Sequence, residues 1–68
     1  MDEIAKNLSG LVNDSEMKAE EIAKIIGVSR AMFYKYLNGA HMMPAPLVKK
    51  ICLLLKCRYE DVLGELEN

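Results

Sequence analysis

The basic side chains of this 68-residue chain are gathered in one part of the sequence, and lysine and arginine are the groups that bind phosphates. The net charge is −1, but residues 22–58 hold seven of the nine basic residues and no aspartate or glutamate. The acidic residues lie in the two flanking parts, 1–21 and 59–68. Because a polyanion responds to the local field rather than to the average charge, this window predicts a phosphate-binding surface. The alternative is that charges simply alternate between helix ends on a solvated surface.

Residues for catalysis or metal binding do not form a familiar pattern. The chain has no glycine-rich phosphate loop, no HExxH motif, and no serine–histidine–aspartate or cysteine–histidine set that can be placed. His41 has no partner at the spacing of a metal ligand, and Cys52 and Cys57 are too few for a zinc site. We therefore expect no enzyme activity, metal, cofactor or small-molecule ligand, and we expect both cysteines to be small core residues.

The segment 19–38, AEEIAKIIGVSRAMFYKYLN, predicts two short helices joined by a tight turn. Gly27 tolerates the left-handed conformation that ends many helices, and Ser29 is a good cap for the helix that follows. Apolar residues at helical spacing are expected to face inward: Ile22 and Ile26 in the first helix, and Phe33 with Tyr36 or Leu37 in the second.

This segment resembles the DNA-binding helix-turn-helix of the phage repressor and Cro family, a Cro/C1-type, XRE-like motif. The residues that carry the resemblance are spread over nearly the whole chain: Ile22, Ala23, Gly27, Val28, Ser29, Phe33, Tyr36, Gly39, Pro44 and the segment 60–63. The resemblance implies an all-α fold, namely a compact five-helix, lambda-repressor-like DNA-binding domain. Its helix-turn-helix would be formed by the second and third helices, at residues 19–38.

A chain of this length is expected to form a single domain, 1–68, around one thin core. Apolar spacing predicts the remaining helices at 2–13, 47–55 and 59–63. Residues 65–68 are expected to be a frayed tail. No apolar run approaches the roughly 18 residues of a membrane helix, which favours a cytoplasmic protein.

Two positions depart from the pattern of the family. Lys18 stands where relatives often carry a capping serine or threonine, which predicts that Asp14 or Ser15 caps an earlier start of the helix. Ala19 stands where relatives often carry a glutamine that braces a phosphate. That contact is expected to be missing or to come from backbone N–H groups. The expected first helix, 2–13, also lacks the arginines that many relatives point at the DNA backbone. This absence and Ala19 lower the expected affinity for DNA and leave the expected fold unchanged.

The resemblance implies that the N-terminal part of the helix after Ser29 enters the major groove of double-stranded DNA. Arg30 is expected to bind guanine O6 and N7, and Ala31 to meet a thymine methyl group. Tyr34 and Lys35 are expected to contact bases or phosphates. The expected phosphate contacts are Lys18, Asn38, Gly39 and His41. The alternative for each of these residues is a solvated surface position.

One monomer of this size covers little duplex, and relatives bind half-sites about 34 Å apart as symmetric dimers. The expected dimer interface consists of Arg58, Tyr59, Val62 and Leu66. The implied function is a sequence-specific transcriptional regulator, most simply a small repressor that occupies a palindromic operator.

Two other functions remain open at this point. In the first, the helix-turn-helix is a scaffold for protein binding, as in an antirepressor or an antitoxin-like adaptor. The low overall charge, Ala19 and the absence of arginine from the first helix favour that function. In the second, the chain is an assembly module without a nucleic-acid role, against which the acid-free window 22–58 argues. Steep salt dependence of DNA binding would separate the regulator from both.

Overall fold

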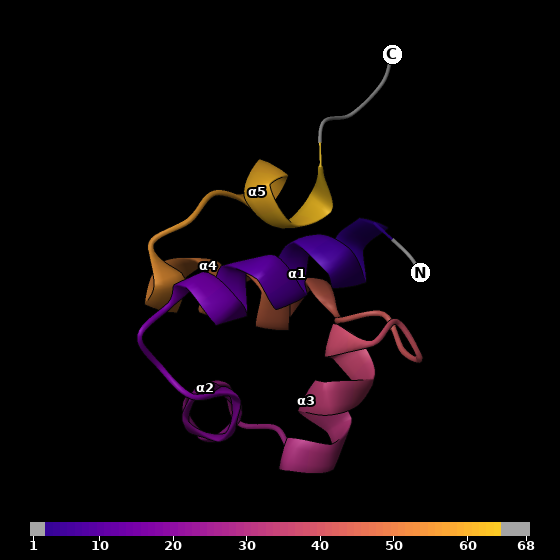
Figure 1. Ribbon diagram of the computed structural model, residues 1–68, viewed down its shortest axis with the longest axis vertical. Coiled ribbons are helices and arrows are strands. Elements are labelled where there is room, and N and C mark those ends of the chain that lie inside the picture. The colour runs from indigo at the N-terminus through magenta and orange to yellow at the C-terminus, as the bar shows by residue number, and fades with distance from the viewer. Residues whose placement is uncertain (1–2, 65–68) are drawn as a thin grey trace.

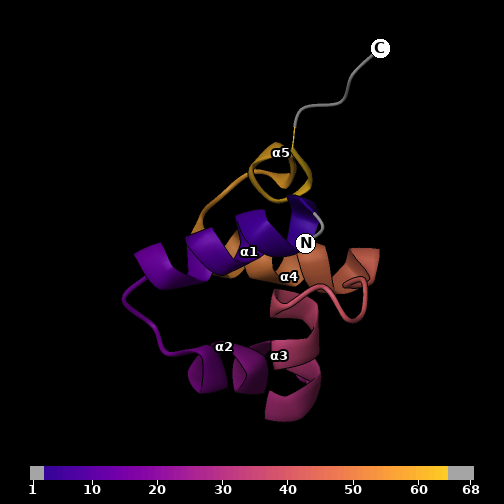
Figure 2. The ribbon, with the colours of Figure 1, turned by 45° about the vertical axis from the view of Figure 1, so that its right-hand side comes forward.

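The structure is a computed structural model that describes residues 3–64. It consists of five helices and, within the described range, no strand: α1 (Glu3–Asp14), α2 (Ala19–Ile26), α3 (Arg30–Leu37), α4 (Ala45–Leu55) and α5 (Tyr59–Leu63). Figures 1 and 2 show α1 and α4 crossing the middle of the molecule, with α2 and α3 on one side and α5 on the other. This arrangement confirms the predicted all-α, five-helix fold.

The predicted helix boundaries agree with the structure to within two residues where both are described. Helix α4 begins two residues earlier than expected, at Ala45. Pro46 therefore lies in the first turn of α4. Proline has no backbone N–H, and in the first turn of a helix this group would have no partner within the helix. The expected start of the first helix at Asp2 and the expected tail 65–68 lie outside the described residues.

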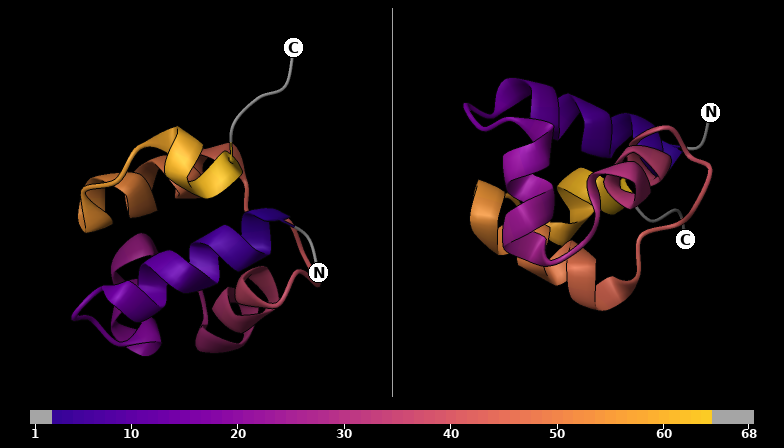
Figure 3. Two further views of the ribbon diagram at one scale, coloured as in Figure 1. Left: turned by 45° about the horizontal axis from the view of Figure 1, so that its top comes forward. Right: turned by 90° about the horizontal axis from the view of Figure 1, so that it is seen from below.

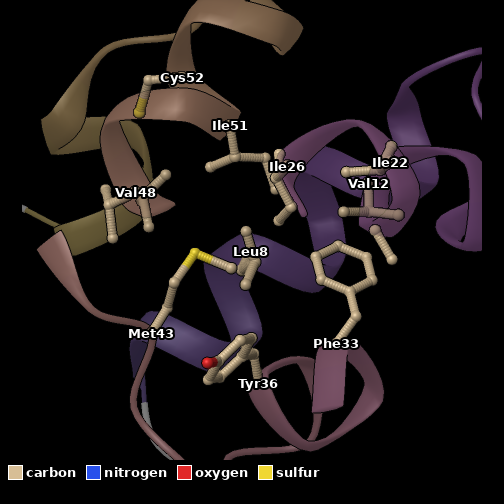
Figure 4. Close-up of a cluster of buried hydrophobic side chains, with 12 residues drawn as sticks. Leu8, Val12, Ile22, Ile26, Phe33, Tyr36, Met43, Val48, Ile51 and Cys52 are labelled. Carbon is tan, nitrogen blue, oxygen red and sulfur yellow. The ribbon is translucent and has the colours of Figure 1, made fainter. Parts of the chain in front are cut away.

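One hydrophobic core connects the helices. The largest side chains that are fully buried are Phe33, Leu8, Ile22, Ile26, Ile51 and Val62. Figure 4 shows Phe33 of α3 pointing toward Val12 of α1, and Met43 pointing toward Leu8. Tyr36 is buried whereas Leu37 is half-buried, so Tyr36 is the second inward residue of α3. Met43 was expected in a loop and does lie outside a helix, but its side chain is only 5% exposed.

The turn between α2 and α3 has the geometry that the sequence predicts. Gly27 adopts φ 87° and ψ 30°, and the N–H groups of Gly27 and Val28 both donate to the carbonyl of Ala23, at 2.9 and 3.0 Å. The Ser29 hydroxyl accepts from the N–H of Met32 at 3.1 Å and thereby caps α3. Figure 1 shows α2 end-on and α3 from the side, and the right panel of Figure 3 shows the turn between them. The steep crossing leaves one side of α3 uncovered.

The start of α2 differs from the prediction, because neither Asp14 nor Ser15 caps an earlier start. Helix α2 begins at Ala19, and the backbone N–H of Lys18 donates to Oε1 of Glu21 at 3.1 Å. The ammonium group of Lys18 has no lone pair and cannot accept a hydrogen bond. The carboxylate of Glu21 therefore caps this helix, while the Ser15 hydroxyl donates to the carbonyl of Val12 at 2.8 Å.

Two polar side chains of α1 bind the ends of other helices. The Ser9 hydroxyl donates to the carbonyl of Leu37 at the end of α3, at 2.8 Å. The side-chain amide of Asn7 donates to the carbonyl of Val62 in α5, at 3.1 Å. Carbonyls at helix ends lack hydrogen-bond donors within their own helix, so Ser9 and Asn7 of α1 supply these donors to the ends of α3 and α5. No helix within residues 3–64 is long and apolar enough to cross a membrane.

Candidate nucleic-acid interface

The exposed side of α3 displays all four residues that were expected to read bases. Arg30, Ala31, Tyr34 and Lys35 are exposed, whereas Phe33 and Tyr36 are buried on the opposite side. Ser29 fixes the first turn of the helix, so the position of Arg30 follows directly from the cap. The structure thus brings the four residues together on one solvent-facing surface of a helix that the core holds in place.

The guanidinium group of Arg30 has two neighbours on this surface. Its Nη1 lies 3.6 Å from Oε2 of Glu20, and its Cζ lies 5.9 Å from the centroid of the Tyr34 ring. Both side chains of the ion pair are more than half exposed. An exposed ion pair contributes only about 0–1 kcal/mol to stability. The contacts with Glu20 and Tyr34 therefore orient the Arg30 side chain but do not fix its position.

An open groove of about 740 Å³ lies between the end of α1, the start of α2 and the exposed side of α3. Four of the expected DNA contacts line it: Lys18, Arg30, Tyr34 and Asn38. Other polar groups share its walls, namely Ser9, Asn13, Ser15 and Glu20. Residues expected to bind bases and residues expected to bind phosphates therefore meet in one concave surface.

The segment after α3 holds the remaining residues that were expected to bind phosphates. Asn38 ends the helix, and its Oδ1 accepts from the N–H of Ala40 at 3.0 Å. Gly39 has φ 84°, and the N–H of His41 donates to the carbonyl of Lys35 at 3.2 Å. These bonds order the segment and leave the His41 side chain exposed.

Glu20 is the residue of this surface that sequence reasoning missed. It belongs to the acidic part of the sequence, 1–21, yet the fold places its carboxylate beside Arg30 in the acid-free window. The separation of charges along the chain is therefore not preserved in space. The two residues are ten positions apart in the sequence, and their proximity depends on the crossing of α2 and α3 rather than on a local spacing.

The expected dimer interface needs a correction. Val62 is fully buried and packs in the core of the monomer, and Leu66 lies outside the described residues. Arg58 and Tyr59 are exposed, and Nη1 of Arg58 lies 3.5 Å from Oε1 of Glu60. Val62 was assigned to the interface because a thin core seemed to have no use for it, whereas in the structure α5 directs it against the core.

Exposed apolar side chains gather near Tyr59, and we name this surface the α4–α5 face: Met42, Leu53, Tyr59 and Leu63. Met42 and Leu53 are each 71% exposed. Two apolar grooves of about 230 and 280 Å³ adjoin the face and share Tyr59 as a wall. The left panel of Figure 3 shows α4 and α5 lying close together along this part of the molecule. Met42 and Leu53 were not predicted for an interface, because Met42 lies outside a helix and helical spacing does not indicate whether an outward apolar residue binds a partner.

The two cysteines are free thiols, and they lie at the joint between α4 and α5. Cys52 is buried and Cys57 is half-buried, which agrees with the expectation of small residues in or beside the core. Burial raises the pKa of the Cys52 thiol to about 11, and a hydrogen bond with the Cys57 thiol and the charge of Asp61 act in the same direction. Within residues 3–64, no group of three or more histidine, cysteine, aspartate or glutamate side chains is placed to hold a metal ion.

Comparison with protein families places residues 7–64 within the Cro/C1-type HTH DNA-binding domain. The chain belongs to this family. The match covers most of α1 and all of α2 to α5, so it includes the helix-turn-helix and the helices that support it. A Cro/C1-type HTH domain binds DNA and is not an enzyme, which confirms the expectation drawn from the sequence.

Among curated proteins, this Cro/C1-type chain is similar to Antitoxin PezA of Streptococcus pneumoniae serotype 4 (strain ATCC BAA-334 / TIGR4). The two are 32% identical over 62 residues, which are 91% of this chain and 39% of that protein. The chain therefore spans less than half the length of this relative. No solved structure matched the chain.

Proposed function

We propose that this chain is a sequence-specific transcriptional regulator, most simply a small repressor, which binds a palindromic operator as a dimer with α3 in the major groove. The observation that carries the proposal is the division of α3 into a buried side, Phe33 and Tyr36, and an exposed side that begins with Arg30. Such a helix is held firmly while it offers side chains to base edges. Repression follows from occupation of promoter DNA in the cytoplasm.

Base readout in this proposal starts at the first turn of α3. Arg30 exchanges Glu20 for O6 and N7 of a guanine, which is the commonest specific contact of an arginine in the major groove. Ala31 places a methyl group against a thymine methyl. Tyr34 and Lys35, further along the same exposed side, contact neighbouring bases or phosphates. The low cost of breaking an exposed ion pair permits this exchange.

Phosphate contacts in this proposal come from two segments, one before and one after the base-reading residues in the sequence. Lys18 stands at the start of α2, whereas Asn38, Gly39 and His41 follow the end of α3. Along the chain these two groups flank the base-reading residues, so together they would fix the register of the helix on the duplex. Gly39 contributes its backbone, and the side-chain amide of Asn38 contributes the donor that its bond to Ala40 leaves unused.

The second copy in the proposed dimer occupies the α4–α5 face, with Arg58 at its edge. Helix α5 lies on the side of α1 and α4 that is opposite to α2 and α3 (Figures 1 and 2), so a partner there leaves the exposed side of α3 open. Tyrosine, methionine and arginine are enriched at protein interfaces, and Tyr59 and Met42 of this face and Arg58 at its edge are of these types. Val62 has no part in this interface, because it is buried within the monomer.

Selection of bound sites from a random duplex library tests this function. Wild type, Arg30→Ala and Lys50→Ala are run in parallel, since Lys50 is an exposed basic residue of α4 away from the groove. Wild type and Lys50→Ala should enrich one palindrome, and Arg30→Ala should lose about 1–3 kcal/mol at one base position per half-site. Failure of the wild type to enrich any sequence at low salt would overturn the proposal.

A second candidate function is that of an adaptor that uses the same fold to bind a protein partner. Two observations favour it: the similarity to a protein named Antitoxin PezA, and the presence of Glu20 in the groove that would have to accept phosphates. A regulator that binds phosphates releases counterions, so its affinity for duplex DNA should depend steeply on salt. A protein adaptor should show no such salt-dependent binding to duplex DNA. Titration of the chain with duplex at several salt concentrations therefore distinguishes the two functions.

A further inference from the structure

The carboxylate of Glu20 stands in a groove where the proposed function calls for positive charge. Its Oε2 is 3.6 Å from Nη1 of Arg30, and it shares the walls of the groove with Lys18 and Asn38. Electrostatic interactions in salt extend over about 8 Å, so a phosphate that approaches Arg30 also meets the charge of Glu20. The proposed phosphate contacts alone give no reason for an acidic residue at this position.

The ion pair makes Arg30 respond differently to phosphates and to bases. Paired with Glu20, the guanidinium has little net charge to offer a phosphate, which every DNA sequence presents in the same way. A carboxylate accepts hydrogen bonds but cannot donate them, and phosphate oxygens are acceptors as well. Base edges in the major groove present both acceptors, such as guanine O6 and N7, and donors, such as the N4 amino group of cytosine. Only a base sequence in the correct register satisfies both partners of the pair.

We propose that Glu20 is a specificity-determining residue, which restrains Arg30 from binding phosphates of unrelated DNA and releases it to a guanine of the operator. This inference rests on the proposed function and concerns the same surface. Glu20 thereby weakens binding to all sequences except those whose base edges replace the ion pair. The protein thereby discriminates better between the operator and unrelated DNA, while its affinity for DNA of any sequence is lower.

A purely structural role for Glu20 is the main alternative. Glu20 lies in the first turn of α2, where a negative charge stabilises the positive end of the helix dipole. The same turn already contains Glu21, whose carboxylate accepts the N–H of Lys18. The test must therefore separate an effect on α2 from an effect on Arg30.

The experiment compares wild type, Glu20→Gln and Glu16→Gln on two duplexes of equal length, one selected from the library and one with its sequence scrambled. Glu16 is the matched control, since it is exposed, carries the same charge and does not line the groove. We expect Glu20→Gln to bind the scrambled duplex about two- to fivefold more tightly, the range of an exposed ion pair. The slope of log K against log salt should steepen by about one. Affinity for the selected duplex should rise less, so that the ratio of the two affinities falls.

The same comparison in an Arg30→Ala background tests whether Glu20 acts through Arg30. There, Glu20→Gln should change binding to the scrambled duplex no more than Glu16→Gln does. Equal effects of Glu20→Gln and Glu16→Gln in the native background would overturn the inference, as would weaker binding of Glu20→Gln to both duplexes. Failure of the proposed function appears in the wild type itself, as an absence of salt-dependent binding to either duplex. Failure of this inference appears only in the variants.

Discussion

Two exposed surfaces of the molecule, the groove beside α2 and α3 and the α4–α5 face, are built from the same kind of short helix but present different side chains. The exposed side of α3 and the groove beside it carry arginine, lysine, asparagine and serine side chains. The α4–α5 face carries Met42, Leu53, Tyr59 and Leu63. A charged, hydrogen-bonding groove suits a polyanion, whereas a group of exposed apolar side chains suits a protein surface. A chain of 68 residues thus separates two proposed binding surfaces by placing a shared core between them.

Replacement of Phe33 by alanine has the largest expected effect, because it removes the support that both surfaces share. Phe33 is fully buried between α3 and α1, and truncation of a buried phenylalanine costs about 3–5 kcal/mol of unfolding free energy. Denaturation in urea, followed by circular dichroism, measures the loss. Tyr34→Ala is the control, since this neighbour is exposed and should change stability by no more than about 0.5 kcal/mol. A similar loss in both variants would contradict the division of α3 into two sides.

Replacement of Tyr59 by aspartate affects the α4–α5 face alone. A charge in the middle of the proposed interface should weaken self-association by about 2 kcal/mol, the size of a typical hot spot, and leave the folded monomer intact. Sedimentation equilibrium at several protein concentrations measures this change. Tyr34→Asp places the same charge on the other side of the molecule and should not alter the dimer. If the wild type remains monomeric at high micromolar concentration, the proposed dimer is wrong.

Replacement of Gly27 by alanine affects the turn on the α2–α3 side. An ideal Cβ at this position meets no atom within 4 Å among the described residues, so the cost comes from the backbone conformation alone. The φ of 87° should cost about 1–2 kcal/mol for a residue with a side chain. Gly10→Ala is the matched control, because Gly10 lies within α1 with open space around it and should gain about 0.5–1 kcal/mol. Urea midpoints of the two variants should therefore move in opposite directions.

The smallest expected effect is a dependence of stability on alkaline pH that arises at the joint of α4 and α5. Because the pKa of Cys52 is raised to about 11, the folded protein holds this proton more tightly than the unfolded chain does. The contribution of the protonated Cys52 thiol to the free energy of unfolding is fully present below pH 9 and is lost as the pH rises toward 11. Urea midpoints from pH 8 to 10.5 should fall less steeply in Cys52→Ala than in the wild type. Equal slopes would contradict the raised pKa.

The sequence predicted the fold and the exposed side of α3, because both depend on local patterns. Helical spacing identified Ile22, Ile26 and Phe33, and the glycine and serine of the turn fixed where α2 ends and α3 begins. The expected DNA contacts of these exposed residues remain predictions. Local patterns also identified α5, although it is only one or two turns long.

The errors concern contacts between segments that are distant in the sequence. Val62 was assigned to the surface because a five-residue helix has too few positions to show which side is buried. Met43 lies in a loop, where no periodicity reports that its side chain fills the core. The proximity of Glu20 to Arg30 results from the crossing of two helices, which a linear sequence does not display.

The hydrogen bonds from Ser9 to the end of α3 and from Asn7 to α5 have a consequence for the geometry of an assembly. Helix α1 packs against both α3 and α5, so it connects α3, the helix proposed to read bases, with the proposed interface. In a dimer joined through the α4–α5 face, the packing of α1 against α3 and α5 would help to set the separation of the two α3 helices. In that proposed dimer, the distance between the two half-sites on the DNA would depend on α1, a helix to which no contact with the duplex is assigned.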